Sequence, residues 1–563
     1  MRLVDGKTGR WGIITRGLAL PCALFLGACG DDHDGKAKAG QPHETAEGAL
    51  KFASCPTDLP GQKLGRECAT ASVPLHWDEP EGESIELLVA RYRGNTPSRG
   101  QLWLLDGGPG GTGAIYMDPS ILPLYASLGL DVYVPQHRGT GHSTPLNCDE
   151  ATDIPSCGAA LVDTWGDGLS GFNSVEAGRD VGFLVEQAHA ESEPAFVFGL
   201  SYGSYWAQRY LQAFPKQASG VILEGVFPLS ADLSQGDPIA DTAARSLFEA
   251  CRNEPDCAAA FGDEDPEDVA RRVVSDASDP AKRCLGADGA DPSELELVLT
   301  GLIVSDLGTF VPGVMRRLDR CNEQDQQELT AMAELLVSAF SMDADPSVDN
   351  VPLGLHVIRT DLLAGLSTFP LEERLAAREP LIFWSGAAST EEFAAIVDGW
   401  PVNYPPAAKA LPAAHSPVLL LNGGLDIQTP SPWARELAST LGGQLVEFPF
   451  AGHGVDISLA SPLTLGDASC SLGMLQSFVD DPSAPVDGAC APTAYTPDLA
   501  GKGDITQQVA AQLYGADTPV MGADDAGAPR TKRGLAPGSA LSRDALVATI
   551  RARVREAPGF AAR

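Results

Sequence analysis

Residues 199–203 read Gly-Leu-Ser-Tyr-Gly and match the pattern G-x-S-x-G. Residues 195–198 form a short apolar run typical of a buried strand, and residues 204–214 show a helical pattern. At such a strand-to-helix turn, the glycines avoid collisions with the neighbouring strand and helix, and the serine hydroxyl is lifted above the sheet. The helix N-terminus then points at the negative charge that develops during attack. We therefore predict that Ser201 is a nucleophile.

Strand and helix patterns alternate on both sides of this turn. Strands are predicted at residues 85–93, 102–105, 132–134, 195–198, 221–223, 417–421 and 445–448. This alternation favours the α/β class, with a mostly parallel sheet and helices on both faces. Between residues 228 and 406 the sequence is instead helical, charged and rich in Ala and Leu. That change predicts a helical cap domain inserted into the sheet domain.

Six segments follow from these patterns. They are a signal peptide (1–28), a flexible tether (29–50), the first part of the core (51–227), the cap (228–406), the second part of the core (407–495) and a C-terminal extension (496–563). Within the extension, residues 523–529 are typical of a loose Gly/Ala/Asp segment, and residues 543–556 of a short helix.

A glycine loop directly follows the strand predicted at residues 102–105. Residues 106–111 read Asp-Gly-Gly-Pro-Gly-Gly, and a backbone N–H in such a loop can face a reacting carbonyl oxygen. We predict an oxyanion hole formed by the N–H groups of Gly108 and Tyr202. A phosphate-binding loop and a plain turn are the alternatives. Pro109 lacks a donor and no GK[ST] follows, which disfavours phosphate binding.

Two later strands end in loops that carry an acid and a base. Residues 423–426 read Gly-Gly-Leu-Asp, and residues 452–454 read Gly-His-Gly. The chain order Ser201, Asp426, His453 is that of a known hydrolytic triad. A neutral imidazole takes the hydroxyl proton, and the carboxylate holds its tautomer and stabilises the cation. We predict that His453 is the base and Asp426 the orienting acid.

With these motifs, the chain resembles the tripeptidyl aminopeptidase-like branch of the α/β-hydrolases, close to the proline iminopeptidases. The resemblance spans roughly residues 55–495 and includes Cys68-Ala69-Thr70 through Val73-Pro74, residues 107–111, Arg138-Gly139-Thr140-Gly141, residues 199–203, Leu425-Asp426 with Thr429-Pro430, and residues 452–454. It implies an α/β-hydrolase fold with an inserted helical cap. It also implies a serine exopeptidase that releases residues or short peptides from free N-termini of peptide substrates. We expect no cofactor.

Two positions depart from the family pattern, and one acid is a candidate for substrate binding. Gln136 stands where related enzymes often have Asp, which we expect to alter a structural hydrogen bond. Asp106 stands where iminopeptidases usually have His, which bears on substrate positioning. In such exopeptidases, acidic groups hold the ammonium group of the substrate. Glu224, at the end of the strand predicted at residues 221–223, is a candidate, with a structural role as the alternative.

The N-terminus is typical of an exported protein. Basic residues precede an apolar run at residues 18–26 that is too short to span a bilayer. The run ends in Leu26-Gly27-Ala28-Cys29, which resembles the bacterial lipobox, where the cysteine becomes the lipidated first residue. An ordinary signal with a chance cysteine is the alternative. We expect a lipoprotein of the bacterial cell envelope, anchored to the membrane through Cys29.

Cysteine spacing predicts disulfide bonds, and together with the net charge it argues against metal and nucleic acid as partners. Local disulfides are expected, although sequence does not fix connectivity, between Cys55 and Cys68, Cys148 and Cys157, Cys251 and Cys257, Cys284 and Cys321, and Cys470 and Cys490. None of these pairs has the CxxC spacing of a zinc site, so no metal is expected. The net charge of −36 repels phosphate groups, so nucleic acid is not expected as a partner. Oligomeric state is left open.

Three functions remain compatible with the sequence. The first is the exopeptidase, which works through an acyl-enzyme. The second is an esterase or lipase on small acyl substrates, because the same triad cleaves both bond types. The third is a surface-anchored binding lipoprotein with a degenerate site. The complete triad and both glycine loops argue against this third function, since binding requires none of them.

Overall fold

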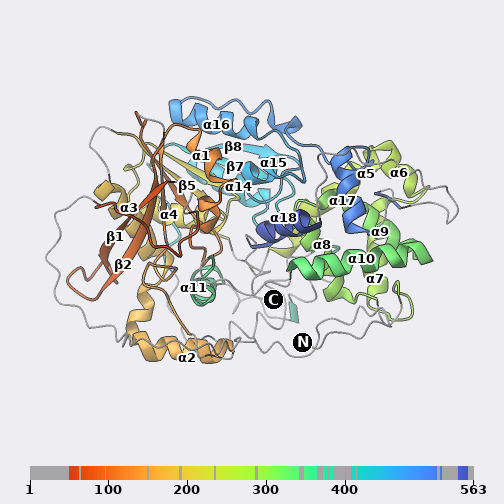
Figure 1. The fold of residues 1–563 in the computed structure, drawn as a ribbon, viewed down its shortest axis with the longest axis horizontal. Coiled ribbons are helices and arrows are strands. Elements are labelled where there is room, and N and C mark those ends of the chain that lie inside the picture. Colours follow the sequence, from red (N-terminus) through yellow and green to blue (C-terminus); the bar gives the residue numbers. More distant parts are fainter. Residues whose placement is uncertain are drawn as a thin grey trace.

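A computed structural model of the chain is shown in Figure 1. It describes residues 50–555 with gaps, the longest of which are residues 341–347, 364–371, 384–399, 401–406 and 523–542. The predictions for the signal peptide, for Cys29, for residues 30–49 and for residues 523–529 concern residues outside this described part. Within the described part, every helix is too short or too polar to cross a membrane.

The described residues form one eight-stranded sheet with the order β1-β2-β4-β3-β5-β6-β7-β8. Its strands are β1 (Arg66–Pro74), β2 (Ser84–Tyr92), β3 (Gln101–Leu105), β4 (Asp131–Pro135), β5 (Ala195–Leu200), β6 (Gly220–Glu224), β7 (Val418–Gly423) and β8 (Gln444–Phe448). The first two strands pair antiparallel, and all neighbours from β4 to β8 are parallel. The prediction of a mostly parallel α/β sheet is confirmed. β1, at the antiparallel edge, was not among the predicted strands.

Helices cover both faces of the sheet, and the alternation of side chains along each strand divides the apolar core in two. Val197 of β5 packs on the side of α3 and α4, whereas Phe196 and Phe198 pack on the side of α1 and α16. The helices around the sheet are α1 (Leu122–Ala126), α2 (Ile154–Trp165), α3 (Ser174–Ala188), α4 (Tyr202–Ala213), α14 (Ser431–Leu441), α15 (Val455–Ala460) and α16 (Ala468–Asp480).

A second set of helices lies beside the sheet, to the right in Figure 1. It comprises α5 (Asp237–Asn253), α6 (Pro255–Ala260), α7 (Pro266–Ala277), α8 (Pro292–Val304), α9 (Val311–Arg320), α10 (Glu323–Phe340), α17 (Asp504–Leu513) and α18 (Arg543–Arg555). These helices share an apolar core of their own. The predicted helical insertion is therefore present, and two helices of the C-terminal extension join it. We call this set the cap.

One helix within the predicted cap range packs elsewhere. The short α11 (Val351–Val357) places Leu353 and Val357 in the apolar core of the sheet domain. Asn350 caps this helix by accepting the N–H of Leu353 at 2.8 Å, and its own N–H donates to the carbonyl of Gly110 at 2.8 Å. This segment therefore ties the inserted sequence to the glycine loop of the core.

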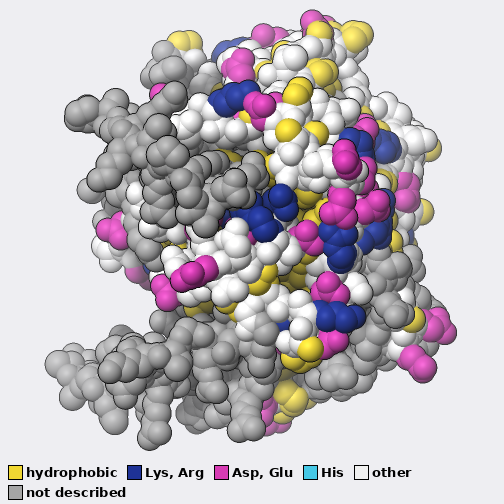
Figure 2. Space-filling view, turned by 90° about the vertical axis from the view of Figure 1, so that its right-hand side faces the viewer, with side chains coloured by type: hydrophobic (Ala, Val, Ile, Leu, Met, Phe, Trp, Pro, Cys, Tyr) yellow, Lys and Arg dark blue, Asp and Glu magenta, His cyan; other side chains and the backbone are white. Residues whose placement is uncertain are grey.

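All five neighbouring cysteine pairs form disulfides, as expected from the sequence. The bridge between Cys284 and Cys321 closes the longest loop, of 37 residues, inside the cap. On the outer face of the cap, acidic and basic side chains lie next to one another (Figure 2), as in the pairs of Arg272 with Glu264 and Asp319. Exposed pairs of this kind add at most about 1 kcal/mol each to stability.

Candidate active site

Ser201 lies at the tight turn between β5 and α4. Its backbone has φ 58° and ψ −126°, a strained conformation for a residue with a side chain. The turn is held by two backbone hydrogen bonds, from Ser201 N to Glu224 O at 2.9 Å and from Ser204 N to Ser201 O at 2.8 Å. A Cβ on Gly203 would lie 2.1 Å from the carbonyl oxygen of Leu105, so this position requires glycine. The geometry is that of the predicted nucleophile turn.

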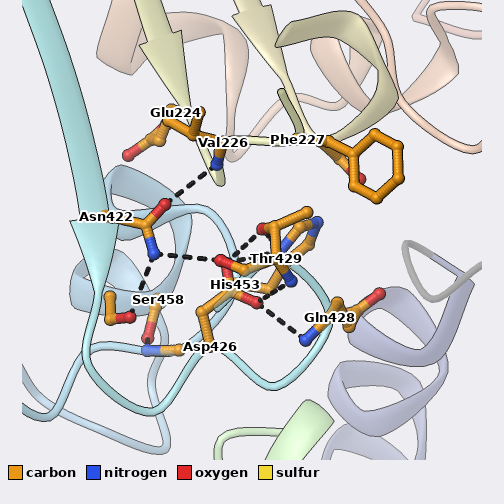
Figure 3. A network of polar contacts seen from close by, with 12 residues as sticks. Glu224, Val226, Phe227, Asn422, Asp426, Gln428, Thr429, His453 and Ser458 are labelled. Atoms are coloured by element: carbon orange, nitrogen blue, oxygen red, sulfur yellow. Dashed lines mark hydrogen bonds and ion pairs between the residues drawn. The ribbon is translucent and has the colours of Figure 1, made fainter. Parts of the chain in front are cut away.

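Asp426 lies in the loop after β7 and is fully buried. One carboxylate oxygen accepts the backbone N–H groups of Gln428 at 3.0 Å and Thr429 at 2.8 Å. The other accepts the hydroxyl of Thr429 at 2.6 Å and faces Nδ1 of His453 at 2.8 Å (Figure 3). These hydrogen bonds fix the orientation of the carboxylate.

His453 lies in the loop after β8, with its ring buried. Since Asp426 is an acceptor, Nδ1 carries the proton in the neutral tautomer, which leaves Nε2 as the basic nitrogen. The ring rests against Gly225, where a Cβ would lie 2.9 Å from Cε1 of His453 and the backbone has φ 54°. A glycine after β6 therefore makes room for the imidazole.

The acid and base loops approach each other through two adjacent glycines. A Cβ on Gly423 would lie 2.3 Å from the carbonyl oxygen of Ala451, and one on Gly424 would lie 2.1 Å from that of Pro449. Asn422 at the end of β7 adds a cross-link, because its Oδ1 accepts the N–H of Val226 and its Nδ2 donates to the carbonyl of Thr429 (Figure 3). Neither Asn422 nor a role for the Thr429 hydroxyl was predicted from the sequence, although Thr429-Pro430 belonged to the family pattern.

Ser201 and His453 line the same cavity, which has a volume of about 640 Å³. This size is within the range for small-molecule sites, about 300–1,000 Å³. Most of its wall is apolar and includes Ile115, Met117, Ile121, Leu200, Val348 and Ile457. Its charged lining side chains are Asp106, Asp118 and Asp349, and the described wall holds no Lys or Arg. The described wall of the cavity is thus mostly apolar, and its charged side chains are acidic.

The glycine loop passes directly beside the nucleophile. A Cβ on Gly107 would lie 3.0 Å from Cβ of Ser201, and both Gly107 and Gly108 line the cavity. The N–H of Gly107 donates to the Asp106 carboxylate at 2.7 Å, and that of Gly113 donates to its other oxygen at 2.7 Å. Since Gly107 N–H is engaged with Asp106, Gly108 N–H remains our predicted oxyanion donor, together with Tyr202 N–H at the first turn of α4.

Asp106 is a half-buried acid that shapes this loop. Burial raises the pKa of its carboxyl to about 6, against the opposing effect of the two backbone N–H groups it accepts. The carboxylate also lies against the loop itself, because a Cβ on Gly111 would come within 2.6 Å of Oδ2. Asp106, the acid that departs from the family pattern, therefore holds the glycine loop in its conformation.

Glu224 lies below the nucleophile turn and is fully buried. Its backbone carbonyl accepts the N–H of Ser201, and its carboxylate accepts the N–H of Asp456 at 2.9 Å, in the first turn of α15. It is not among the residues that line the cavity. These contacts support the structural role, and binding of a substrate amine by Glu224 stays an untested prediction that the geometry does not favour.

Gln136 makes structural hydrogen bonds, as expected, and Arg138 of the Arg-Gly-Thr-Gly segment also has a structural role. Arg138 is fully buried and donates two hydrogen bonds to Asp180, at 2.7 and 2.6 Å. Gln136 donates to the carbonyl of Thr112 at 3.2 Å and accepts the N–H of His142 at 2.7 Å. Gln136 therefore joins the glycine loop to the Arg-Gly-Thr-Gly turn. Among the described residues, no cluster of three or more His, Cys, Asp or Glu side chains could hold a metal ion.

Two parts of the chain match known protein families. Residues 104–258 match the family described as alpha/beta hydrolase fold, and residues 385–490 match the family described as TAP-like protein. Carboxylesterase B of Mycobacterium tuberculosis is 30% identical over 146 residues, which cover 24% of this chain and 27% of that protein. Serine protease Hip1 of Mycobacterium tuberculosis is 23% identical over 265 residues, which cover 41% of this chain and 50% of that protein. The chain thus matches half or less of the length of these relatives.

Two solved structures are also similar to parts of the chain. A thermophilic esterase from Thermogutta terrifontis is 16% identical, with a TM-score of 0.29 over 74% of this chain and 99% of that chain. Haloalkane dehalogenase DbeA from Bradyrhizobium elkani is 15% identical, with a TM-score of 0.32 over 74% of this chain and 98% of that chain. Its strand order and the two family matches show that the chain has the α/β-hydrolase fold, and its residues 385–490 are similar to the TAP-like family.

Proposed function

We propose that this protein is a serine hydrolase, and more narrowly a serine exopeptidase that removes single residues or short peptides from free N-termini. Ser201 attacks the scissile carbonyl while Nε2 of His453 takes the hydroxyl proton, and Asp426 stabilises the resulting imidazolium. The N–H groups of Gly108 and Tyr202 stabilise the oxyanion. The protonated imidazole gives its proton to the leaving amine, which leaves an acyl-enzyme on Ser201. Water then attacks the ester with His453 again as base, releasing the N-terminal fragment.

The observation that supports an exopeptidase is the charge of the cavity. Asp118 and Asp349 line it together with Ser201, while the described wall holds no Lys or Arg. A free N-terminus is a cation at neutral pH, so these carboxylates attract it, whereas a blocked N-terminus gains nothing from them. The apolar wall suits the side chains of a short peptide. We propose that Asp118 and Asp349 select for the substrate ammonium group.

A second candidate is an esterase on small acyl substrates. The mostly apolar wall of the cavity favours it, and so does the part of the chain that matches Carboxylesterase B. The triad would act in the same way on both bond types. The two candidates differ in whether a charged amine on the substrate increases the rate.

Two experiments test the proposal. Labelling by a short-chain fluorophosphonate is expected to disappear in Ser201→Ala and to persist in Ser120→Ala, a matched control at an exposed serine in the same cavity. Labelling that survives in Ser201→Ala would rule out the assigned nucleophile. A peptide library with free and acetylated N-termini, analysed by mass spectrometry, is then compared with nitrophenyl esters.

We expect kcat/KM for free N-termini to exceed that for acetylated ones by at least about tenfold, which corresponds to about 1.4 kcal/mol. The double variant Asp118→Asn, Asp349→Asn should remove most of this preference by raising KM for the free peptides. Equal cleavage of both peptide sets would overturn the exopeptidase proposal. Rapid ester hydrolysis without peptide cleavage would instead support the esterase.

We further propose that the protein is exported and anchored through a lipid on Cys29. The support is the lipobox-like sequence that ends at this residue and the five disulfides, which persist in an oxidising compartment.

A further inference from the structure

One face of the C-terminal helix α18 is anchored in the cap. Leu546 and Ile550, four residues apart and therefore on the same side of the helix, are both fully buried in the apolar core of the cap. Arg551 adds a hydrogen bond from its guanidinium to the carbonyl of Ser338 on α10, at 2.7 Å. The helix is thus held by the cap helices along one side.

Another side of the same helix reaches the active-site cavity. Ala548 and Thr549 line it together with Ser201 and His453. Ala548 follows Leu546 by two residues, which places it about 200° around the helix, on the side opposite the buried face. Accordingly, Ala548 is exposed while Leu546 is fully buried. Both cavity-facing side chains are small.

Figure 1 shows where this places α18, between the strands and loops of the sheet domain and the helices of the cap. Most of the rest of the cavity wall comes from the core, mainly from residues 106–121 and 457–462, and Val348 and Asp349 come from the inserted sequence. The match to the TAP-like family ends at residue 490, so this part of the wall lies outside both family matches. It therefore belongs to the C-terminal extension of this particular chain.

We propose that α18 is a wall of the substrate site and that position 548 determines how large a substrate group the cavity admits. This inference rests on the proposed role of Ser201 as nucleophile. The cap core fixes the helix through Leu546 and Ile550, so a larger side chain at position 548 has to project into the cavity. The small side chains of Ala548 and Thr549 leave room for an extended substrate. Added bulk should therefore exclude long groups and spare short ones.

The test uses alkyl fluorophosphonates of increasing chain length, because they react with Ser201 whether the natural substrate is a peptide or an ester. In Ala548→Phe, the second-order labelling rate is expected to fall at least tenfold for the longest probe and to stay within about threefold for the shortest. Ala548→Val should give an intermediate result and serves if the Phe variant does not fold. The thermal unfolding midpoint of each variant monitors folding.

The matched control is Asp544→Phe, which places the same side chain at an exposed position one turn earlier on α18 that does not line the cavity. It should leave the dependence on chain length unchanged. The inference is wrong if Ala548→Phe and Ala548→Val slow all probes equally or leave the longest unaffected, or if Asp544→Phe has the same length-dependent effect. If the shortest probe fails to label the unmodified protein, the proposed nucleophile is wrong instead.

Discussion

Replacement of Asp426 by Asn tests the catalytic arrangement most directly. The side chain keeps its shape, and one oxygen can still accept the N–H groups of Gln428 and Thr429. With that oxygen fixed, the new amide nitrogen takes the place of Oδ2, 2.8 Å from Nδ1 of His453. An amide N–H donates, so Nδ1 must become the acceptor and the proton moves to Nε2. The imidazole can then no longer take the proton of Ser201.

The size of the effect follows from this change of tautomer. The equivalent change in a serine protease triad lowers kcat by about 10⁴, which corresponds to about 5 kcal/mol in the activation barrier. We expect a similar loss in kcat for the best peptide or ester substrate, with KM changed little. The control is Asp467→Asn, because this exposed carboxylate caps α16 and Asn caps helices equally well. A loss of less than about tenfold in Asp426→Asn, with the fold intact, would refute the assigned acid.

Three further predictions concern other parts of the molecule. Gly225→Ala should lower kcat/KM more than tenfold by displacing the ring of His453. The control is Gly262→Ala, which has a similar positive φ but no atom within 4 Å of the new Cβ, and which should therefore lower stability alone. Steady-state kinetics and thermal unfolding distinguish the two effects. Because the pKa of Asp106 rises to about 6 on folding, its proton favours the native state, so the free energy of unfolding should fall by roughly 3 kcal/mol as pH rises from about 4 to 6 and level off above. Urea titrations in that pH range should show a shallower fall for Asp106→Asn; an unchanged slope would contradict the assignment. Cys29→Ser should move the protein from the membrane fraction to the soluble fraction of a producing bacterium, and membrane retention by the variant would argue against the lipid anchor.

The sheet and the triad could be predicted because their signals are local. The segments before Ser201, Asp426 and His453 are short and apolar, and each ends in a glycine-containing turn. The carboxyl ends of parallel strands meet at one edge of a sheet, so three distant residues come together once the strands are recognised. The disulfides were equally local, since every bridge joins neighbouring cysteines in the sequence.

Features that depend on packing between distant segments could not be predicted, because the sequence around them carries no local pattern that indicates the contact. Nothing near Gly225 indicates that an imidazole 228 positions later will rest on it. Glu224 follows a strand just as a substrate-binding acid would, yet its carboxylate accepts the N–H of Asp456 in α15. A helix was predicted at residues 543–556, but a 3.6-residue period does not say which cavity its exposed side will face. Strand β1 was not predicted, because its residues around Cys68 were interpreted only as a motif of the related family.

The shared core of the cap has a consequence for how the chain acquires its structure. α10 ends at Phe340 and α17 begins at Asp504, and most of the second half of the sheet domain lies between them. Domains form in the order in which a ribosome delivers them, and apolar surfaces that await a late partner promote aggregation. Part of the apolar side of helices α5 to α10 therefore stays exposed to solvent until α17 and α18 have been synthesised. A product shortened at residue 490 would keep every triad residue and still present that unprotected surface to the solvent.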